Sequence, residues 1–122
     1  MIRRTQLSRR DFLATAAAVT ATAASGTSAI AAANDRMKVA FIGVGGRGGR
    51  NLRTIASTNS VDVVGLCDVE SRFVANAAEQ FPSAHIFSDF RKLYDSIGNQ
   101  IDAVVVSTTE HTHAYATMPA LR

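Results

Sequence analysis

The sequence predicts an α/β fold built on a parallel β-sheet. Short apolar runs alternate with helical patterns from residue 37 onward, which is the order typical of β-α-β units. A glycine-rich turn follows the first apolar run, and an acidic residue follows the second. Hydrophobic residues make up 47% of the chain and charged residues 19%, so we expect a packed core rather than disorder.

Four apolar runs are predicted to be strands. They cover residues 38–42 (KVAFI), 61–67 (VDVVGLC), 85–87 (HIF) and 103–106 (AVVV). The second run is apolar along most of its length, which predicts a strand covered on both faces, as in a parallel sheet.

Helical patterns separate these strands. Helices are expected over residues 50–57 and 72–81, from a cap at Ser88 or Asp89 to Tyr94, and from about Thr112 onward. In the first helix, Leu52, Ile55 and Ala56 have the spacing of one buried face. Pro82 ends the second helix. No turn signal or cap precedes Arg122, so we expect the domain to be truncated at that residue.

The first 33 residues have a different character. Arg9-Arg10 is followed by Phe12 and Leu13, by a weakly apolar Ala/Thr-rich stretch, and by small residues over 29–33 that fit an AxA cleavage site. The stretch is too short and too mildly apolar for a permanent transmembrane helix. It resembles a twin-arginine signal peptide. This resemblance implies export to the periplasm through the twin-arginine machinery, which carries folded proteins; an Ala-rich tail that contains RR by chance is the alternative.

We therefore divide the chain into a signal peptide, 1–33, and an incomplete domain, 34–122. The signal segment has a charge of +3, which equals the formal net charge of the whole chain, so the domain is neutral. A neutral domain without a basic stripe argues against nucleic-acid binding. The single cysteine, Cys67, excludes an internal disulfide and a multi-cysteine zinc site, and its apolar surroundings predict a small buried side chain.

The glycine-rich turn over residues 43–48 fits GxGxxG in a single register. Gly43 is expected to make the tight turn, Gly45 to let a pyrophosphate approach the backbone, and Gly48 to let the helix pack closely on the strand. Backbone N–H groups at the helix N-terminus then face the phosphates. The predicted cofactor-binding residues of this turn are Gly43, Gly45, Gly46, Arg47 and Gly48. Together with the alternating strands and helices, this motif predicts a doubly wound, Rossmann-type sheet.

Asp68 follows the second predicted strand, twenty residues beyond Gly48. An acid at this place accepts hydrogen bonds from the adenosine ribose hydroxyls and repels a 2′-phosphate, so we predict that Asp68 binds the cofactor and favours NAD over NADP. Arg47 and Arg72 keep NADP possible because either side chain could reach a 2′-phosphate.

A polar segment, 107–113 (STTEHTH), follows the fourth predicted strand at the edge where open α/β sheets bind ligands. It could serve only to begin a helix, or supply His111 and His113 to a metal, or line a cofactor or substrate site. Two ligands are too few for a metal site, so we predict none. We favour the third interpretation, with Thr108 and His111 binding the cofactor and His113 lying near the substrate.

Four segments together resemble the N-terminal domain of the glucose-fructose oxidoreductase/inositol dehydrogenase (Gfo/Idh/MocA) family. They are KVAFIGVGGRGGRNLRTIA, VVGLCDVESRFVANAAEQFP, FSDFRKLYD and IDAVVVSTTEHTHAYATMPAL. Thr108 to His113 match the family's T-P-(N/D)-x-x-H loop, except that Thr109 replaces the proline and Glu110 the Asn or Asp. The resemblance implies a catalytic lysine, which we expect beyond Arg122; the catalytic residue is therefore unknown here.

The resemblance implies that the full-length protein is an exported NAD(P)-dependent oxidoreductase. It would transfer hydride between the nicotinamide and a sugar or polyol, act as a homo-oligomer, and carry its cofactor with it through export. A redox-neutral NAD-dependent glycosidase of the same family and a non-catalytic nucleotide-binding module are the alternatives. The segment after the fourth strand argues against a FAD- or S-adenosylmethionine-binding domain.

Overall fold

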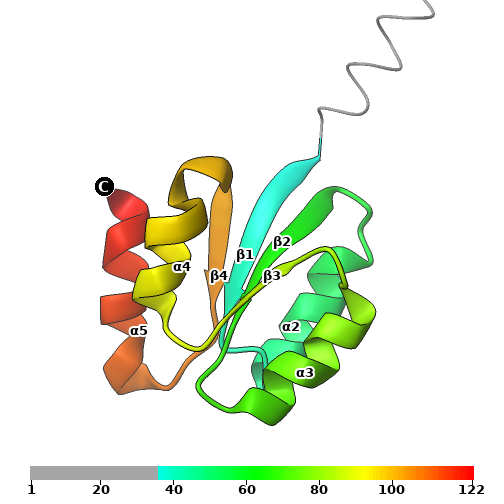
Figure 1. Cartoon of the computed structure of the whole chain (residues 1–122), viewed down its shortest axis with the longest axis horizontal. Coiled ribbons are helices and arrows are strands. Elements are labelled where there is room, and N and C mark those ends of the chain that lie inside the picture. Colours follow the sequence, from blue (N-terminus) through cyan, green and yellow to red (C-terminus); the bar gives the residue numbers. More distant parts are fainter. Residues whose placement is uncertain (1–35) are drawn as a thin grey trace, which may run out of the picture. The chain divides into compact units, whose positions relative to one another are not determined.

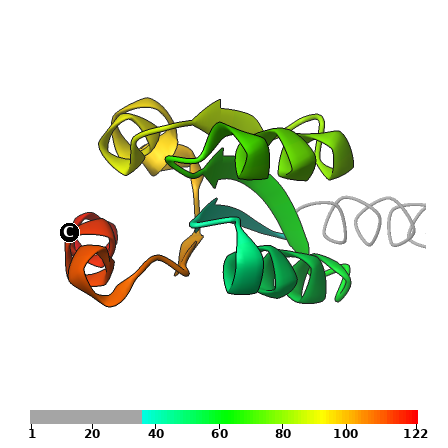
Figure 2. The ribbon, with the colours of Figure 1, turned by 90° about the horizontal axis from the view of Figure 1, so that it is seen from below.

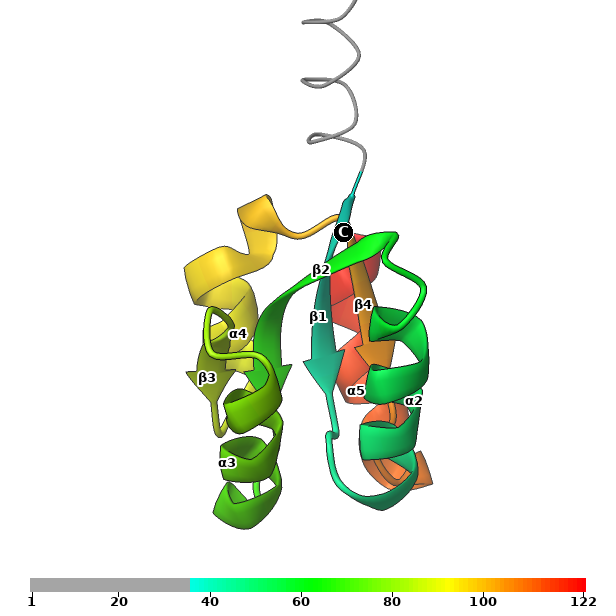
Figure 3. The ribbon, with the colours of Figure 1, turned by 90° about the vertical axis from the view of Figure 1, so that its right-hand side faces the viewer.

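The computed structural model describes residues 36–122, which contain one four-stranded parallel sheet (Figure 1). Its strands are β1 (Met37–Ile42), β2 (Val61–Cys67), β3 (His85–Phe87) and β4 (Ala103–Val106). The spatial order is β3-β2-β1-β4, and Figure 3 shows all four strands pointing the same way. The predicted α/β, Rossmann-type fold is confirmed.

Two pairs of helices enclose the sheet. Figure 2 shows α2 (Gly46–Ala56) and α3 (Ser71–Gln80) on one face, and α4 (Phe90–Ile97) and α5 (Glu110–Thr117) on the other. Short 3₁₀ turns, Gly98–Gln100 and Met118–Leu121, follow the second pair. The arrangement is doubly wound because the chain reverses its direction across the sheet between β3 and β4.

The core consists of two layers, one on each face of β1. Val39 and Phe41 pack with Leu52 of α2, whereas Ala40 and Ile42 pack with Leu93 of α4. The alternation follows from the two-residue period of a strand. All four β1 residues are buried, so the turn after β1 starts from a fixed position.

Several element boundaries differ from the predictions. Helix α2 begins at Gly46, four residues before the predicted start, because its first turn is built from the glycines themselves. Helix α4 continues past Tyr94 to Ile97, since Leu93 and Ile97 are both buried against the sheet. Helix α5 begins at Glu110 rather than near Thr112. Strand β2 is buried only over its last three residues, so the expectation that it is covered on both faces was wrong for its first half.

The predicted signal peptide lies outside the described residues. Within residues 36–122, no helix is long and apolar enough to span a bilayer.

Candidate functional site

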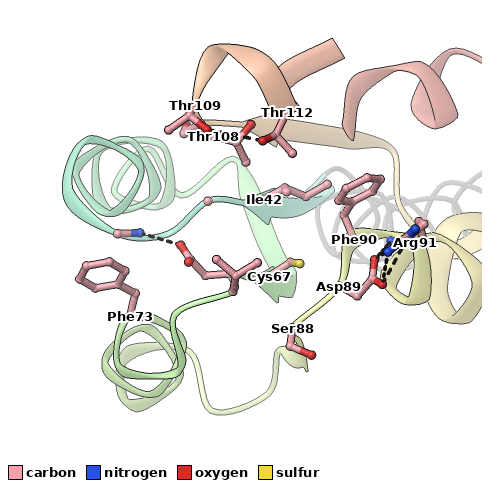
Figure 4. A pocket seen from close by; sticks show the side chains of 15 residues that line it. Ile42, Cys67, Phe73, Ser88, Asp89, Phe90, Arg91, Thr108, Thr109 and Thr112 are labelled. Atoms are coloured by element: carbon pink, nitrogen blue, oxygen red, sulfur yellow. Dashed lines mark hydrogen bonds and ion pairs between the residues drawn. The ribbon is translucent and has the colours of Figure 1, made fainter. Parts of the chain in front are cut away.

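A cavity of about 420 Å³ lies where the carboxyl ends of β1, β2 and β4 meet (Figure 4). This is the edge, and the point of reversal between β1 and β4, where doubly wound sheets bind ligands. The lining residues follow the ends of all four strands: Ile42, Gly43, Gly45, Cys67, Asp68, Val69, Phe73, Ser88, Asp89, Phe90, Arg91, Ser107, Thr108, Thr109 and Thr112. Segments far apart in the sequence therefore share one hollow.

The glycine turn fits closely against its neighbours. Gly43 has a φ of +85°, and a Cβ on it would lie 2.7 Å from the Ser107 carbonyl oxygen. A Cβ on Gly48 would overlap the Gly43 carbonyl oxygen, so α2 can approach the turn only because residue 48 has no side chain. Gly46 also has a positive φ, +48°, although a Cβ there would meet nothing. The packing expected for Gly43 and Gly48 is present.

The backbone N–H groups at the N-terminus of α2 can donate hydrogen bonds to a ligand. The N-cap of this helix is Gly45, which has no side chain that could cap the helix, and the first turn contains no acidic side chain. The first N–H groups of a helix lack intrahelical partners and carry a partial positive charge. This end of α2 is therefore suited to an anionic group such as a phosphate. Gly46 and Arg47 are exposed there, whereas Gly48 is buried.

The Asp68 carboxylate ties the glycine turn to the end of β2. Its Oδ2 accepts from the Val44 N–H at 2.8 Å and from the Gly45 N–H at 3.2 Å, and its Oδ1 accepts from the Glu70 N–H at 3.0 Å. Asp68 thus lies next to the glycine turn, and both were predicted from the sequence to bind the cofactor. Its hydrogen bonds also hold that turn in place.

The two arginines near the acidic end of the site are each paired with a carboxylate. Arg72 Nε lies 3.2 Å from Glu70, and Arg91 Nη2 lies 2.9 Å from Asp89. The side-chain and backbone hydrogen bonds from Arg91 lower the pKa of Asp89, which also caps α4. Both guanidinium groups are thus paired, but their side chains are largely exposed, 76% for Arg72 and 75% for Arg91, and they keep further N–H donors.

The segment after β4 presents hydroxyl groups to the cavity. Thr108 Oγ1 is buried and has no hydrogen-bond partner among the described residues, although it lines the cavity. Buried hydroxyls are normally paired, so this atom is suited to a ligand. Ser107 Oγ accepts from Asn51 Nδ2 at 3.1 Å, which joins β4 to α2. Thr109 is the N-cap of α5 but makes no side-chain cap hydrogen bond within the described residues, so helix capping does not account for the Thr109 hydroxyl.

The histidines point elsewhere. Neither His111 nor His113 is among the residues that line the cavity. His113 Nε2 lies 3.0 Å from the Val106 carbonyl oxygen, which can only accept, so this nitrogen donates. His111 Nε2 lies 3.4 Å from Thr109 Oγ1. Among residues 36–122, no group of three His, Cys, Asp or Glu side chains could hold a metal ion.

Residues 37–122 match the family model described as an oxidoreductase family with an NAD-binding Rossmann fold. The chain belongs to this Gfo/Idh/MocA family. Residues 6–26 match the model of the twin-arginine translocation signal sequence, so this Gfo/Idh/MocA chain carries a signal for export across the cytoplasmic membrane. The family resemblance of the sequence is confirmed for both parts.

Two curated relatives are glycosyl hydrolase family 109 proteins. That of Akkermansia muciniphila is 30% identical over 86 residues, which are 65% of this chain and 18% of the relative. That of Stenotrophomonas maltophilia is 27% identical over 127 residues, which are 95% of this chain and 28% of the relative. The Gfo/Idh/MocA chain therefore spans less than a third of the length of either relative.

Solved structures of inositol dehydrogenases share the fold. The myo-inositol dehydrogenase of Lactobacillus casei, in complex with NAD(H) and myo-inositol, has a TM-score of 0.63 and 25% identity, over 70% of this chain and 25% of that one. The scyllo-inositol dehydrogenase of the same organism, with NAD(H) and scyllo-inositol, has a TM-score of 0.64 and 21% identity, with the same coverage. The second likeness concerns the fold alone.

The structure adds residues that the sequence analysis did not assign to the site. Phe73, Ser88, Phe90 and Arg91 all line the cavity of this Gfo/Idh/MocA domain. The sequence could have indicated that Phe73 lies near the site, because it belongs to the first turn of the helix that follows Asp68. Cys67 also lines the cavity, and its pKa is raised to about 11 by burial first and by the Asp68 and Asp89 carboxylates second. It is buried, as predicted, and unsuited to act as a nucleophile.

Proposed function

We propose that this domain binds NAD in the cavity at the carboxyl edge of the sheet, as the cofactor domain of an exported oxidoreductase. The observation that carries the proposal is the Asp68 carboxylate held against the glycine turn at the reversal point of the sheet. The fit of a dinucleotide is supported by two further features: the uncapped N-terminus of α2 suits a pyrophosphate, and the unpartnered Thr108 Oγ1 suits a ligand hydroxyl or amide.

Each group of residues has a task in this proposal. The turn over residues 43–48, including Arg47, would hold the pyrophosphate through backbone N–H groups, and Asp68 would accept from the ribose hydroxyls. Thr108 would fix the part of the cofactor nearest β4. The bound nicotinamide supplies hydride transfer at C4. The role of His111 at the cofactor and of His113 near the substrate stays a prediction, as does the catalytic lysine beyond Arg122.

The charges favour NAD over NADP. In this proposal, Asp68 would bring a negative charge close to a 2′-phosphate, and the nearby Arg72 and Arg91 are each already paired with a carboxylate. Arg47 is exposed and does not line the cavity. An added 2′-phosphate would therefore meet repulsion from Asp68, and the cavity-lining Arg91 already has Asp89 as its partner.

For the whole protein we propose a substrate of the sugar or polyol class, a periplasmic location, a boundary near residue 33 and assembly into a homo-oligomer. The myo-inositol dehydrogenase neighbour, which holds a polyol, supports the substrate class, and the twin-arginine signal supports the location. A redox-neutral glycosidase that uses NAD catalytically is the second candidate, favoured by the two glycosyl hydrolase family 109 relatives.

The cofactor proposal is tested by calorimetric titration of the chain with NAD and with NADP. NAD should bind at least tenfold more tightly, and Asp68→Ser should reduce this ratio because it removes the repulsion of the 2′-phosphate. Tighter binding of NADP by the unmodified chain would refute the coenzyme assignment and point to Arg47 or Arg72.

The two candidate reactions are separated by absorbance assays of the full-length protein. An oxidoreductase should reduce NAD in proportion to the myo-inositol or sugar consumed. A glycosidase should instead release the leaving group of an aryl glycoside, require NAD, and accumulate no NADH.

A further inference from the structure

Phe73 lies against the glycine turn at the site of closest backbone approach. It is the third residue of α3, and its ring lies beside Gly45. A Cβ built on Gly45 would overlap this ring, whose Cγ would be 2.7 Å away. The ring also lines the cavity, and 38% of Phe73 is exposed.

This contact conflicts with the purpose of a glycine at that place. Gly45 has φ −87° and ψ 160°, an extended conformation that any residue adopts, so its backbone does not require glycine. The GxGxxG pattern keeps the space above the second glycine free so that a pyrophosphate can approach. Here the same space is filled by the phenyl ring. The ring and a pyrophosphate therefore compete for one position.

We propose that the Phe73 ring covers Gly45, competes with the pyrophosphate for that position, and turns aside when the pyrophosphate binds. The inference rests on the proposed function. The ring can leave without a change in the backbone because it projects from the first turn of α3 and is already partly in water. The Arg72 guanidinium, 5.7 Å from the ring centroid, is exposed and can move with it.

The first test compares ligands with and without a pyrophosphate. Phe73→Ala should bind NAD and ADP-ribose about tenfold more tightly than the parent, since uncovering about half of a phenyl side chain costs on the order of 1.4 kcal/mol. Adenosine has no pyrophosphate, so its affinity should not change. Tyr115→Ala, which removes an exposed ring outside this cavity, is the control and should leave all three affinities unchanged. Unchanged or weaker NAD binding by Phe73→Ala would overturn the inference.

The second test asks what Gly45 makes room for. Gly45→Ala alone should destabilise the fold because its methyl group meets the ring. The double variant Gly45→Ala/Phe73→Ala should unfold at the same temperature as Phe73→Ala, yet bind NAD at least tenfold more weakly than Phe73→Ala does. If the double variant and Phe73→Ala bind NAD with equal affinity, a glycine at residue 45 is needed only to accommodate the ring, and the inference is wrong.

The third test observes the movement directly. The chain contains no tryptophan, so Phe73→Trp places a single fluorescent reporter on the turn. Saturation with ADP-ribose, which lacks the nicotinamide and its quenching, should shift the emission to longer wavelength as the indole enters water. An unshifted emission at saturation overturns the inference while leaving the proposed function intact. If no variant binds NAD although all unfold cooperatively, the proposed function fails and the inference fails with it.

Discussion

Replacement of Asp68 should damage the fold as well as the cofactor preference. Three backbone N–H groups, those of Val44, Gly45 and Glu70, donate to its carboxylate. Asp68→Ala removes both acceptor oxygens and therefore all three hydrogen bonds at once. Asp68→Asn keeps one oxygen, which can serve either the glycine turn or Glu70, and turns an NH₂ group toward the other donor.

The expected loss follows from the number and burial of these bonds. A hydrogen bond to a charged group contributes roughly 1.5–3 kcal/mol when buried, and partial access of water lowers this to about 1 kcal/mol each. Asp68→Ala should therefore lower the free energy of unfolding by about 3 kcal/mol, and Asp68→Asn by about 1 kcal/mol. For a domain of this size, 1 kcal/mol corresponds to about 4–8 °C in Tm, so the expected decreases are about 12–24 °C and 4–8 °C.

Thermal unfolding followed by circular dichroism measures these shifts. Asp62→Ala is the matched control. Asp62 forms a half-exposed ion pair with Arg36 at 2.9 Å, and it lies at the start of β2, the strand that Asp68 follows. Such exposed ion pairs contribute about 0–1 kcal/mol to the free energy of unfolding, so the Tm of Asp62→Ala should be only a few degrees lower. If Asp68→Ala unfolds at the same temperature as Asp62→Ala, the carboxylate does not hold the glycine turn and the argument is refuted.

Further predictions concern packing, chemistry and export. Gly48→Ala should lower the free energy of unfolding by about 3 kcal/mol in urea, because its Cβ overlaps a backbone carbonyl that cannot move; a smaller loss than an exposed glycine substitution would contradict this. Cys67 should resist alkylation at pH 8 until the protein unfolds, since its pKa is raised to about 11, and rapid labelling of the folded protein would contradict its burial. A reporter fused after Ala33 should be exported, and lysines at Arg9 and Arg10 should abolish this. The chain alone should show no sugar-dependent reduction of NAD, and clear turnover would disprove a catalytic lysine elsewhere.

The strands were predictable because neighbouring residues in the sequence determine where each strand begins and ends. β2, β3 and β4 have the predicted bounds, since each is a short apolar run between turn residues. The start of α2 was not predictable from propensity, because glycine disfavours helices. Its first turn is fixed instead by the close packing of Gly48 on Gly43.

The site was predictable where sequence spacing determines geometry. The glycine turn and Asp68 follow neighbouring strands, and hydrogen bonds join them as expected. The neighbours of Phe73 depend on how α3 packs, which spacing does not reveal. The directions of the side chains after β4 depend on where α5 begins. Thr108 and Thr109 precede the helix and Thr112 lies in its first turn; these three line the cavity, and the histidines do not.

The position of β1 in the sheet has a consequence for synthesis of the protein. β1 is made first among the strands but lies between β2 and β4, and its Val39 pairs with Val63 on one side and with Ala103 on the other. Ala103 follows Val39 by 64 positions in the sequence, which take about 3–13 s to translate at 5–20 residues per second. The export signal in residues 6–26 is complete well before β1 can gain its second neighbour. Because the twin-arginine machinery carries folded proteins, engagement has to wait until β4 pairs with β1 and closes the cofactor edge.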